Sequence, residues 1–158
     1  MKLRNFIKND EAISISIGFM ITFAITVIVF SGLRISFYSL TQNLEKSAMR
    51  ENFKMIGSGV ASKITAVDTL VNVTNSYSGT VNMLEYEFSL PASVAGKTYT
   101  INITKSPYKI IFEADNGARE VSLFNTSTNF TPVVLYSASE NFMIKYNQSS
   151  SSIYIVEQ

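Results

Sequence analysis

The first pattern along the chain is an uncharged apolar run at residues 12–33. A helix of this length spans roughly 30 Å, the thickness of the hydrocarbon core of a bilayer. A secretory signal has an apolar core of only about 7–15 residues and then a small-x-small cleavage site. Here the run is longer and is followed by Arg34-Ile35-Ser36-Phe37. The pattern therefore predicts a transmembrane helix in contact with membrane lipid.

The charges on either side of this run predict its orientation. Lys2, Arg4 and Lys8 precede it, against Asp10 and Glu11. Because an excess of basic residues marks the cytoplasmic flank, we expect a single-pass protein of the cell membrane. Its N-terminus would be cytoplasmic and its C-terminal part extracellular.

Helical periodicity continues beyond the membrane. Apolar residues recur mostly every three or four positions up to Val71, with charged and polar residues between them, which is the pattern of one apolar stripe. No proline occurs before Pro91, so we expect one nearly continuous helix over residues 13–71. Gly57 and Gly59 either kink this helix or lower its helicity, at about 1 kcal/mol each, or allow close contact with the globular domain. We slightly favour the first interpretation.

From Asn72 onward, β-branched and aromatic residues alternate with polar ones. Asp115-Asn116-Gly117 predicts a tight hairpin, and the alternation from residue 98 to 103 places Tyr99, Ile101 and Ile103 inward. The expected strands are residues 82–90, 98–104, 108–114, 120–124, 132–137, 142–147 and 153–156.

The predicted fold class is α+β. Seven short strands indicate a small antiparallel β-sandwich or curled sheet, whose core the helix stripe at residues 53–67 could complete. The expected domains are a cytoplasmic leader (1–12), a transmembrane and stalk helix (13–71) and an extracellular β-domain (72–158).

The composition excludes several kinds of catalytic and metal-binding site. The chain has no Cys and no His, so it offers no thiol nucleophile, no His-based acid–base pair and no zinc site with His or Cys ligands. Its net charge of +1 gives no reason to expect nucleic acid as a partner. Glu85 and Glu87 flank Tyr86 on one expected strand face, where they form either a calcium or acid–base site or an ordinary solvated surface. We expect the surface, no enzyme activity and no cofactor.

The junction before the apolar run carries a resemblance. At this junction Asp10 and Glu11 are followed by Ala12 and then by the helix start at Ile13-Ser14. This order of residues resembles the processing site (class III signal peptide) of archaeal type IV prepilins and pre-archaellins. The resemblance covers roughly residues 8–40 and differs in having Ser16 where many archaeal pilins have Pro. It implies that a prepilin peptidase cuts after Ala12, that the apolar helix is kept, and that the fold is a pilin-like lollipop.

Small and hydroxyl residues are interspersed among the large apolar residues of this run. Gly18, Ala24, Ser31 and Gly32 would let sister helices approach closely in lipid; alternatively, the hydroxyls simply bond back to the carbonyls of their own helix.

Five sequons for N-glycosylation fall on the expected outer side, at Asn72, Asn102, Asn125, Asn129 and Asn147. The resemblance implies a surface filament of a kind that is commonly glycosylated in archaea. We therefore expect two or three of the five sequons to carry a glycan.

Three functions are compatible with these features. The first is a minor or pilin-like subunit of an archaeal type IV pilus-like filament, with a structural or adhesive role and sister subunits as partners. The second is a non-polymerising, membrane-anchored surface protein with a β-sandwich head, stator-like or in contact with the envelope. The third is an anchored enzyme or solute-binding module, which the absence of Cys and His disfavours.

Overall fold

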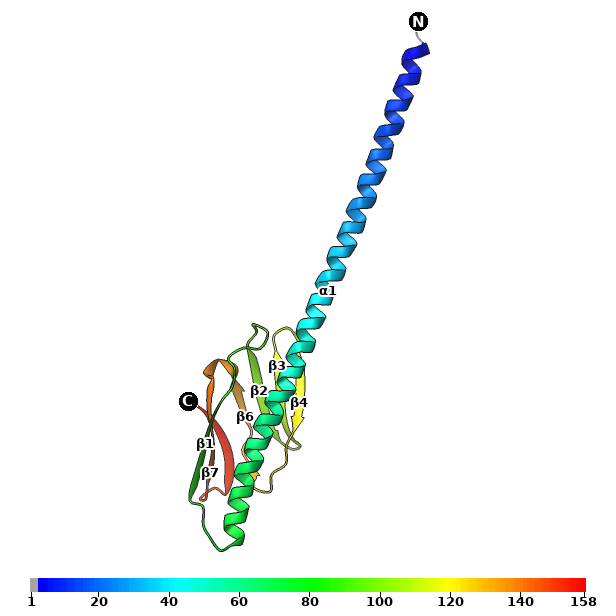
Figure 1. Cartoon of the computed structure of the whole chain (residues 1–158). Helices are drawn as coiled ribbons and strands as arrows, with labels where there is room; N and C mark the ends of the chain where they lie inside the picture. Colours follow the sequence, from blue (N-terminus) through cyan, green and yellow to red (C-terminus); the bar gives the residue numbers. More distant parts are fainter. Residues whose placement is uncertain (1–2) are drawn as a thin grey trace. The chain divides into compact units, whose positions relative to one another are not determined.

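The computed structural model describes the backbone of residues 3–158 and the side chains of residues 13–158. The chain divides into two units, Met1–Leu44 and Glu45–Gln158. A single helix, α1 (Leu3–Ser76), forms the described part of the first unit and the beginning of the second (Figure 1). The expected layout of a long apolar N-terminal helix followed by a small, mostly antiparallel β-domain is confirmed.

The helix continues past Val71, where the apolar stripe ends, and a capping motif stops it. Ser78 has a left-handed backbone (φ 59°). Its amide donates to the Asn75 carbonyl at 3.2 Å, and the Gly79 amide donates to the Thr74 carbonyl at 3.0 Å. These two bonds form a Schellman motif, which satisfies the last carbonyls of a helix. Sequence periodicity did not detect this cap because serine replaces the usual glycine at the left-handed position.

Eight strands form two four-stranded sheets in the second unit (Figure 1). In spatial order, the first sheet comprises β1 (Met83–Ser89), β7 (Asn141–Asn147), β8 (Ser152–Glu157) and β5 (Asn129–Phe130). The second comprises β4 (Arg119–Leu123), β3 (Tyr108–Ala114), β2 (Tyr99–Lys105) and β6 (Val133–Tyr136), and a short 3₁₀ turn, η1 (Ser137–Ser139), follows β6. All pairings are antiparallel except that of β5 with β8.

The strands that alternate most clearly in sequence behave as expected. Tyr99, Ile101 and Ile103 of β2 are buried, with at most 3% of their surface exposed. The Asp115-Asn116-Gly117 segment closes the hairpin between β3 and β4, with Gly117 at φ 79° and its amide donating to the Ala114 carbonyl at 2.9 Å. A positive φ costs glycine little, so this turn is encoded locally.

The two sheets share one hydrophobic core with the second-unit part of α1. The contributing helix residues recur at helical spacing and are at most 2% exposed: Met49, Phe53, Val60, Ile64, Val67 and Val71. The ring centroid of Phe53 lies 5.0 Å from that of Tyr99 and 5.4 Å from that of Phe112. Burial of this stripe confirms that the helix completes the core of the β-domain.

The favoured interpretation of Gly57 as a kink is wrong. Gly57 is buried inside continuous helix, and a Cβ built there would clash with the Ser122 hydroxyl, lie 2.9 Å from the Ser122 Cβ and lie 3.0 Å from Cε2 of Phe112. The glycine therefore lets α1 approach β3 and β4 closely. At Gly59 a Cβ would meet nothing within 4 Å.

These two glycines provide a matched pair of substitutions. Gly57→Ala gains about 1 kcal/mol of helix propensity but forces atoms into a packed contact, which typically costs about 1–3 kcal/mol. We expect a net loss of about 1 kcal/mol for Gly57→Ala and a gain of up to about 1 kcal/mol for Gly59→Ala. Urea unfolding of the full chain in detergent, followed by near-ultraviolet circular dichroism of the tyrosines, measures both. Equal effects at the two positions would contradict the close contact.

Candidate functional site

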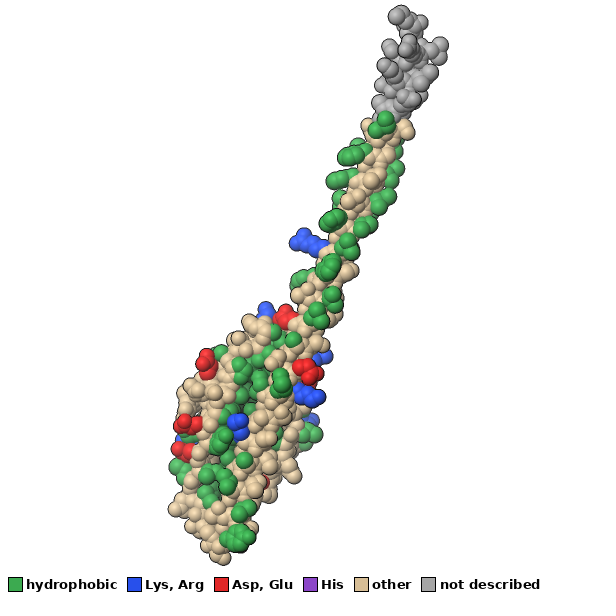
Figure 2. All heavy atoms as spheres, in the orientation of Figure 1, with side chains coloured by type: hydrophobic (Ala, Val, Ile, Leu, Met, Phe, Trp, Pro, Cys, Tyr) green, Lys and Arg blue, Asp and Glu red, His purple; other side chains and the backbone are tan. Residues whose placement is uncertain are grey.

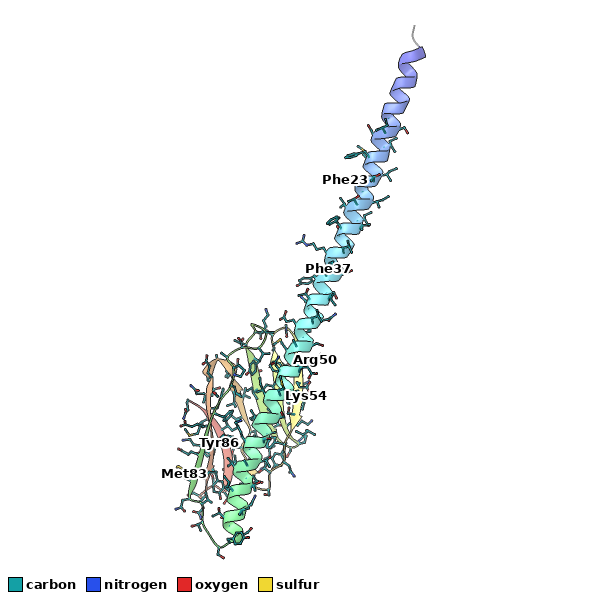
Figure 3. All side chains as sticks on the ribbon, in the orientation of Figure 1. Phe23, Phe37, Arg50, Lys54, Met83 and Tyr86 are labelled. Atoms are coloured by element: carbon teal, nitrogen blue, oxygen red, sulfur yellow. The ribbon has the colours of Figure 1, made fainter. Side chains whose placement is uncertain are left out.

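The surface that distinguishes this molecule is the bare apolar helix of its first unit. Every large hydrophobic side chain from Ile13 to Leu44 is between 47% and 74% exposed. Figure 2 shows hydrophobic side chains along the described length of this segment, and Phe23 and Phe37 project from it in Figure 3. Within residues 13–158, α1 is the one helix long and apolar enough to cross a membrane.

Four hydroxyl groups in this segment donate to the carbonyls of their own helix. Thr22 donates to the Gly18 carbonyl at 2.9 Å, and Thr26 donates to the Thr22 carbonyl at 2.8 Å. Ser36 and Thr41 make the same bond to the carbonyl four residues earlier, at 3.0 and 2.9 Å. Because these groups already have partners, they can face lipid without an unsatisfied donor.

The residues expected to promote helix packing lie on more than one face of the helix. Gly18 and Gly32 share one face because they are four turns apart, and nothing comes within 4 Å of a Cβ built at either. Ala24 and Ser31, which are seven residues apart, share another face, roughly 110° away. All four are exposed, so the structure of the single chain brings none of them into contact with another element.

The expected processing site falls at the edge of the described residues. Glu11 and Ala12 lie outside the described side chains, whereas Ile13 and Ser14 are exposed on α1. The cut after Ala12 therefore stays a prediction.

The five sequons differ in how their side-chain amides are used. A glycan is attached through the amide nitrogen of Asn, so that nitrogen must be accessible. Asn102, Asn125 and Asn129 are exposed, although Lys105 donates to the Asn129 side-chain oxygen. Asn147 is half-buried and its side-chain oxygen accepts from the Ser149 amide at 2.8 Å.

Asn72 is the exception among the sequons because its amide nitrogen is engaged in the fold. It lies within α1 and donates to the Asp68 carbonyl at 2.8 Å and to the Ser127 hydroxyl at 2.6 Å. A glycan on this nitrogen would displace the Ser127 loop from the helix.

Glu85 and Glu87 share an outward face of β1, as expected. Glu85 forms an ion pair with Lys145 of β7 at 2.8 Å, and this hydrogen bond raises the pKa of Lys145. Glu87 lies opposite Met143 in the register. Within residues 13–158 no three His, Cys, Asp or Glu side chains are close enough to hold a metal ion.

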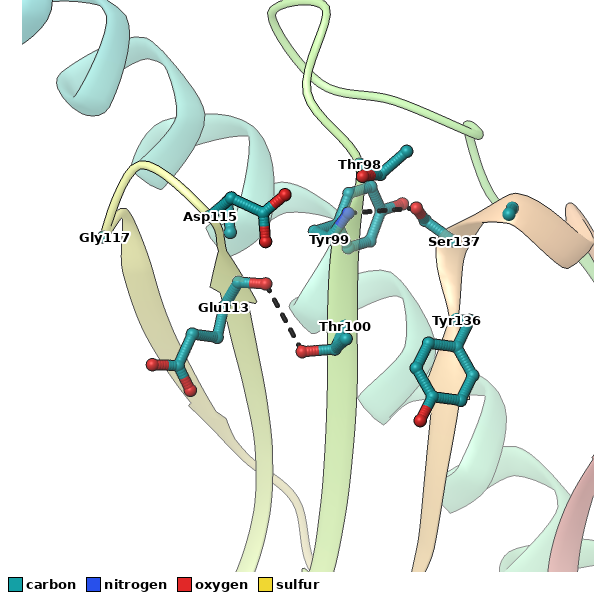
Figure 4. A pocket seen from close by; sticks show the side chains of 10 residues that line it. Thr98, Tyr99, Thr100, Glu113, Asp115, Gly117, Tyr136 and Ser137 are labelled. Carbon is teal, nitrogen blue, oxygen red and sulfur yellow. Dashed lines mark hydrogen bonds between the residues drawn. The ribbon is translucent and has the colours of Figure 1, made fainter.

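A hollow of about 610 Å³ lies at one end of the second sheet, between the start of β2, the β3–β4 turn and the end of β6 (Figure 4). Its polar lining includes the side chains of Glu113, Asp115 and Tyr136, together with Thr98 and Thr100. Ser137 has a structural role there, because its hydroxyl accepts from the Tyr99 amide at 3.0 Å and donates to the Ala92 carbonyl at 2.8 Å. The hollow therefore offers carboxylates and hydroxyls.

One protein-family model matches most of the chain. The model of DUF7266, described as a family of unknown function, matches residues 8–156. The chain belongs to the DUF7266 family. No curated protein and no solved structure matches it. The match to DUF7266 includes both the apolar helix and the β-domain, so the two parts recur together as one family unit.

Sequence reasoning missed one polar site in this DUF7266 chain, at Asp68. This carboxylate is only 7% exposed on α1. It accepts hydrogen bonds from the Ser127 amide at 3.0 Å, the Ser127 hydroxyl at 3.0 Å and the Thr128 amide at 2.9 Å. Burial alone would raise its pKa, but these bonds outweigh burial and hold the pKa at about 2. The signal available in the sequence was a single acidic residue beside the apolar stripe. The residues that donate hydrogen bonds to it lie about 60 positions away.

We expect Asp68→Asn to destabilise the β-domain of this DUF7266 chain. The amide group replaces one acceptor with a donor that faces backbone N–H groups, at a cost of about 2 kcal/mol. Since the folded pKa of Asp68 is about 2, against 3.8 ordinarily, the carboxylate stabilises the fold above pH 4, and this contribution is lost as the pH falls towards 2.

Urea unfolding of the full chain in detergent at pH 7 and pH 2.5 checks this expectation. Glu85→Gln is the control, because its exposed ion pair is worth less than about 1 kcal/mol. The gap between the wild type and Asp68→Asn should be largest at pH 7 and should shrink at pH 2.5. A gap that does not change with pH would refute the role of the charge.

The sequons of this DUF7266 chain give a second expectation. Glycopeptide mass spectrometry of the native protein should find Asn72 unmodified and two or three of the other four sequons occupied. Removing Asn72 by Asn72→Gln should leave the glycan mass unchanged, whereas Asn102→Gln or Asn129→Gln should lower it if that site is used. A glycan on Asn72 in folded protein would contradict the assignment.

Proposed function

We propose that this protein is a minor pilin-like subunit of an archaeal type IV pilus-like surface filament. The helix is retained in the membrane after the leader is cut, the β-domain lies outside the cell, and the role is structural or adhesive. The proposed partners are membrane lipid, a prepilin peptidase and sister subunits that contact the helix.

One observation supports this proposal most strongly. The same helix has an uncharged, exposed segment of membrane-spanning length, from Ile13 to Leu33, and a later segment that forms part of the core of the β-domain. A cleavable signal needs no such continuity, because it is removed before the domain folds. A retained helix that is both anchor and core is the arrangement that the pilin resemblance implies.

A specific observation favours the alternative of a non-polymerising anchored surface protein. Two hydroxyls of the apolar segment, those of Thr22 and Thr26, bond to the carbonyls of their own helix. A helix with these groups satisfied can remain in lipid without sister helices. The alternative shares the anchor and the exposed head but not the filament.

The mature N-terminus and the location of the protein distinguish these functions. We expect the native chain to begin at Ile13 and to appear in filaments sheared from the cell surface. Ala12→Asp should block processing and keep the chain out of the filaments, whereas the control Ser16→Ala should leave both unchanged. A mature chain that begins at Met1 or Lys2 and stays in the membrane fraction would eliminate the filament proposal.

A further inference from the structure

The outer face of the second sheet, which points away from the core, carries exposed apolar side chains. Alternate residues of β2, β3 and β6 are buried, so the residues between them point outward. On this outward side, four large apolar side chains are between 41% and 70% exposed, and the half-buried Ile111 lies opposite one of them in the register. We call these five residues the outer patch: Ile111, Val121, Leu123, Val134 and Tyr136.

The outer face of the first sheet is different, because charged residues lie at its centre. Glu85 and Lys145 form an ion pair across β1 and β7, and Glu87 follows on the same side of β1. Met83, at the end of β1, is exposed, whereas Met143 in the middle of β7 is only 8% exposed. The outer patch is therefore peculiar to the second sheet. Neighbouring exposed apolar side chains of this kind indicate contact with another molecule.

Asn102 lies in the middle of the outer patch. It is exposed on β2, the strand between β3 and β6. In the register it lies opposite Val134 on one side and opposite Ile111 on the other. Side chains that lie opposite each other on one sheet face are about 5 Å apart. Because Asn102 and Thr104 also form a sequon, the patch has an attachment point for carbohydrate at its centre.

Carbohydrate suits the surface around Asn102. A sugar ring has an apolar face of C–H groups and a rim of hydroxyl groups. The C–H face can pack on Val134, Ile111 and the ring of Tyr136, which removes apolar area from water. The hydroxyl rim then needs hydrogen-bonding partners beside the patch.

The hollow at the end of the same face provides such partners. Thr100 is the next outward residue of β2 before Asn102, roughly 7 Å away, and it lies between Tyr136 and Glu113 (Figure 4). The Thr100 hydroxyl donates to the Glu113 backbone carbonyl at 3.4 Å, so its oxygen can still accept a hydrogen bond. The lining of the hollow, which lies wholly within the described residues, includes carboxylates and hydroxyls but no Lys or Arg. This composition favours a neutral, hydroxyl-rich ligand over an anionic one.

We propose that Asn102 carries an N-linked glycan that lies over the outer patch and places its sugars in the hollow beside Tyr136. Attachment to the same chain keeps the sugars at high effective concentration, so weak contacts suffice to hold them there. The glycan thereby covers the apolar face that the protein leaves exposed. The inference rests on the extracellular β-domain of the proposed function, but not on the filament.

Tyrosine nitration tests the position of the glycan, because it reports the exposure of a phenol ring. The full chain is purified from its native membranes in detergent and treated with tetranitromethane, and nitration rates are read by peptide mass spectrometry. In Asn102→Gln, which removes the attachment point, we expect Tyr136 to be nitrated several-fold faster than in the wild type. Tyr77, which is 85% exposed on α1, should react at the same rate in both proteins.

Thr104 provides a matched pair of variants, because a hydroxyl at this position completes the sequon. Thr104→Ser keeps the sequon and should keep Tyr136 protected. Thr104→Val removes the glycan and should expose Tyr136 to the same extent as Asn102→Gln. As a further control, Asn125→Gln removes a sequon that lies outside the strands of the sheet, and it should leave the Tyr136 rate unchanged.

Two outcomes overturn the inference and leave the proposed function intact. The first is an unmodified Asn102 in native protein that carries glycans on other sequons. The second is a glycan at Asn102 with equal Tyr136 rates in the wild type and in Asn102→Gln. Failure of the proposed function is seen separately, in the mature N-terminus and in the absence of wild-type protein from sheared filaments. A native chain with no glycan on any sequon also overturns the inference.

Discussion

The structure of the β-domain depends on the packing of one side of α1 against its sheets. Phe53 packs its ring against Tyr99 of β2 and Phe112 of β3, and Val60, Ile64 and Val67 continue the contact along the helix. A domain of fewer than 90 residues with two small sheets has little apolar surface to bury by itself. The helix therefore provides a large share of the core, and the β-domain cannot be separated from it without exposing that core.

Two further features adapt the helix to this role. At Gly57 the absence of a side chain lets the helix backbone approach Ser122 and Phe112. About three turns later, Asp68 and Asn72 bond the Ser127–Thr128 loop. The apolar stripe holds the helix over the sheets without directional bonds, whereas these polar contacts fix its rotation and its position along its axis. This division explains why a charged residue is retained in a nearly uncharged contact.

The local part of this arrangement could be predicted from sequence. Alternation identified β2 and β3, the hairpin residues identified their turn towards β4, and the period of the helix stripe identified the face that packs on the sheets. The missed features are non-local. β5 has only two residues and exists because of its parallel pairing with β8, and no local propensity encodes such a strand. Asp68 finds its partners about 60 residues away, and Gly57 has the same residue type as Gly59 but a different environment.

The same limit applies to the candidate site. Sequence alone locates the membrane segment and the five sequons, because both depend on residue type and short spacing. It does not reveal that the Asn72 amide holds a loop in place, since Ser127 is distant in the chain. Nor does it reveal which apolar residues beyond Arg34 remain uncovered, because the stripe from Leu33 to Val71 reads as continuous until the structure shows where burial begins, at Met49.

Burial of the apolar stripe begins at Met49, and the stripe is covered differently on the two sides of that residue. An amphipathic helix in water must cover its apolar stripe. From Met49 to Val71 the chain covers the stripe with its own sheets, whereas from Leu33 to Leu44 nothing within residues 13–158 covers it. The same helix therefore carries a stripe that its own sheets bury and a stripe that they leave exposed, and the change falls between Leu44, 61% exposed, and Met49, 0% exposed.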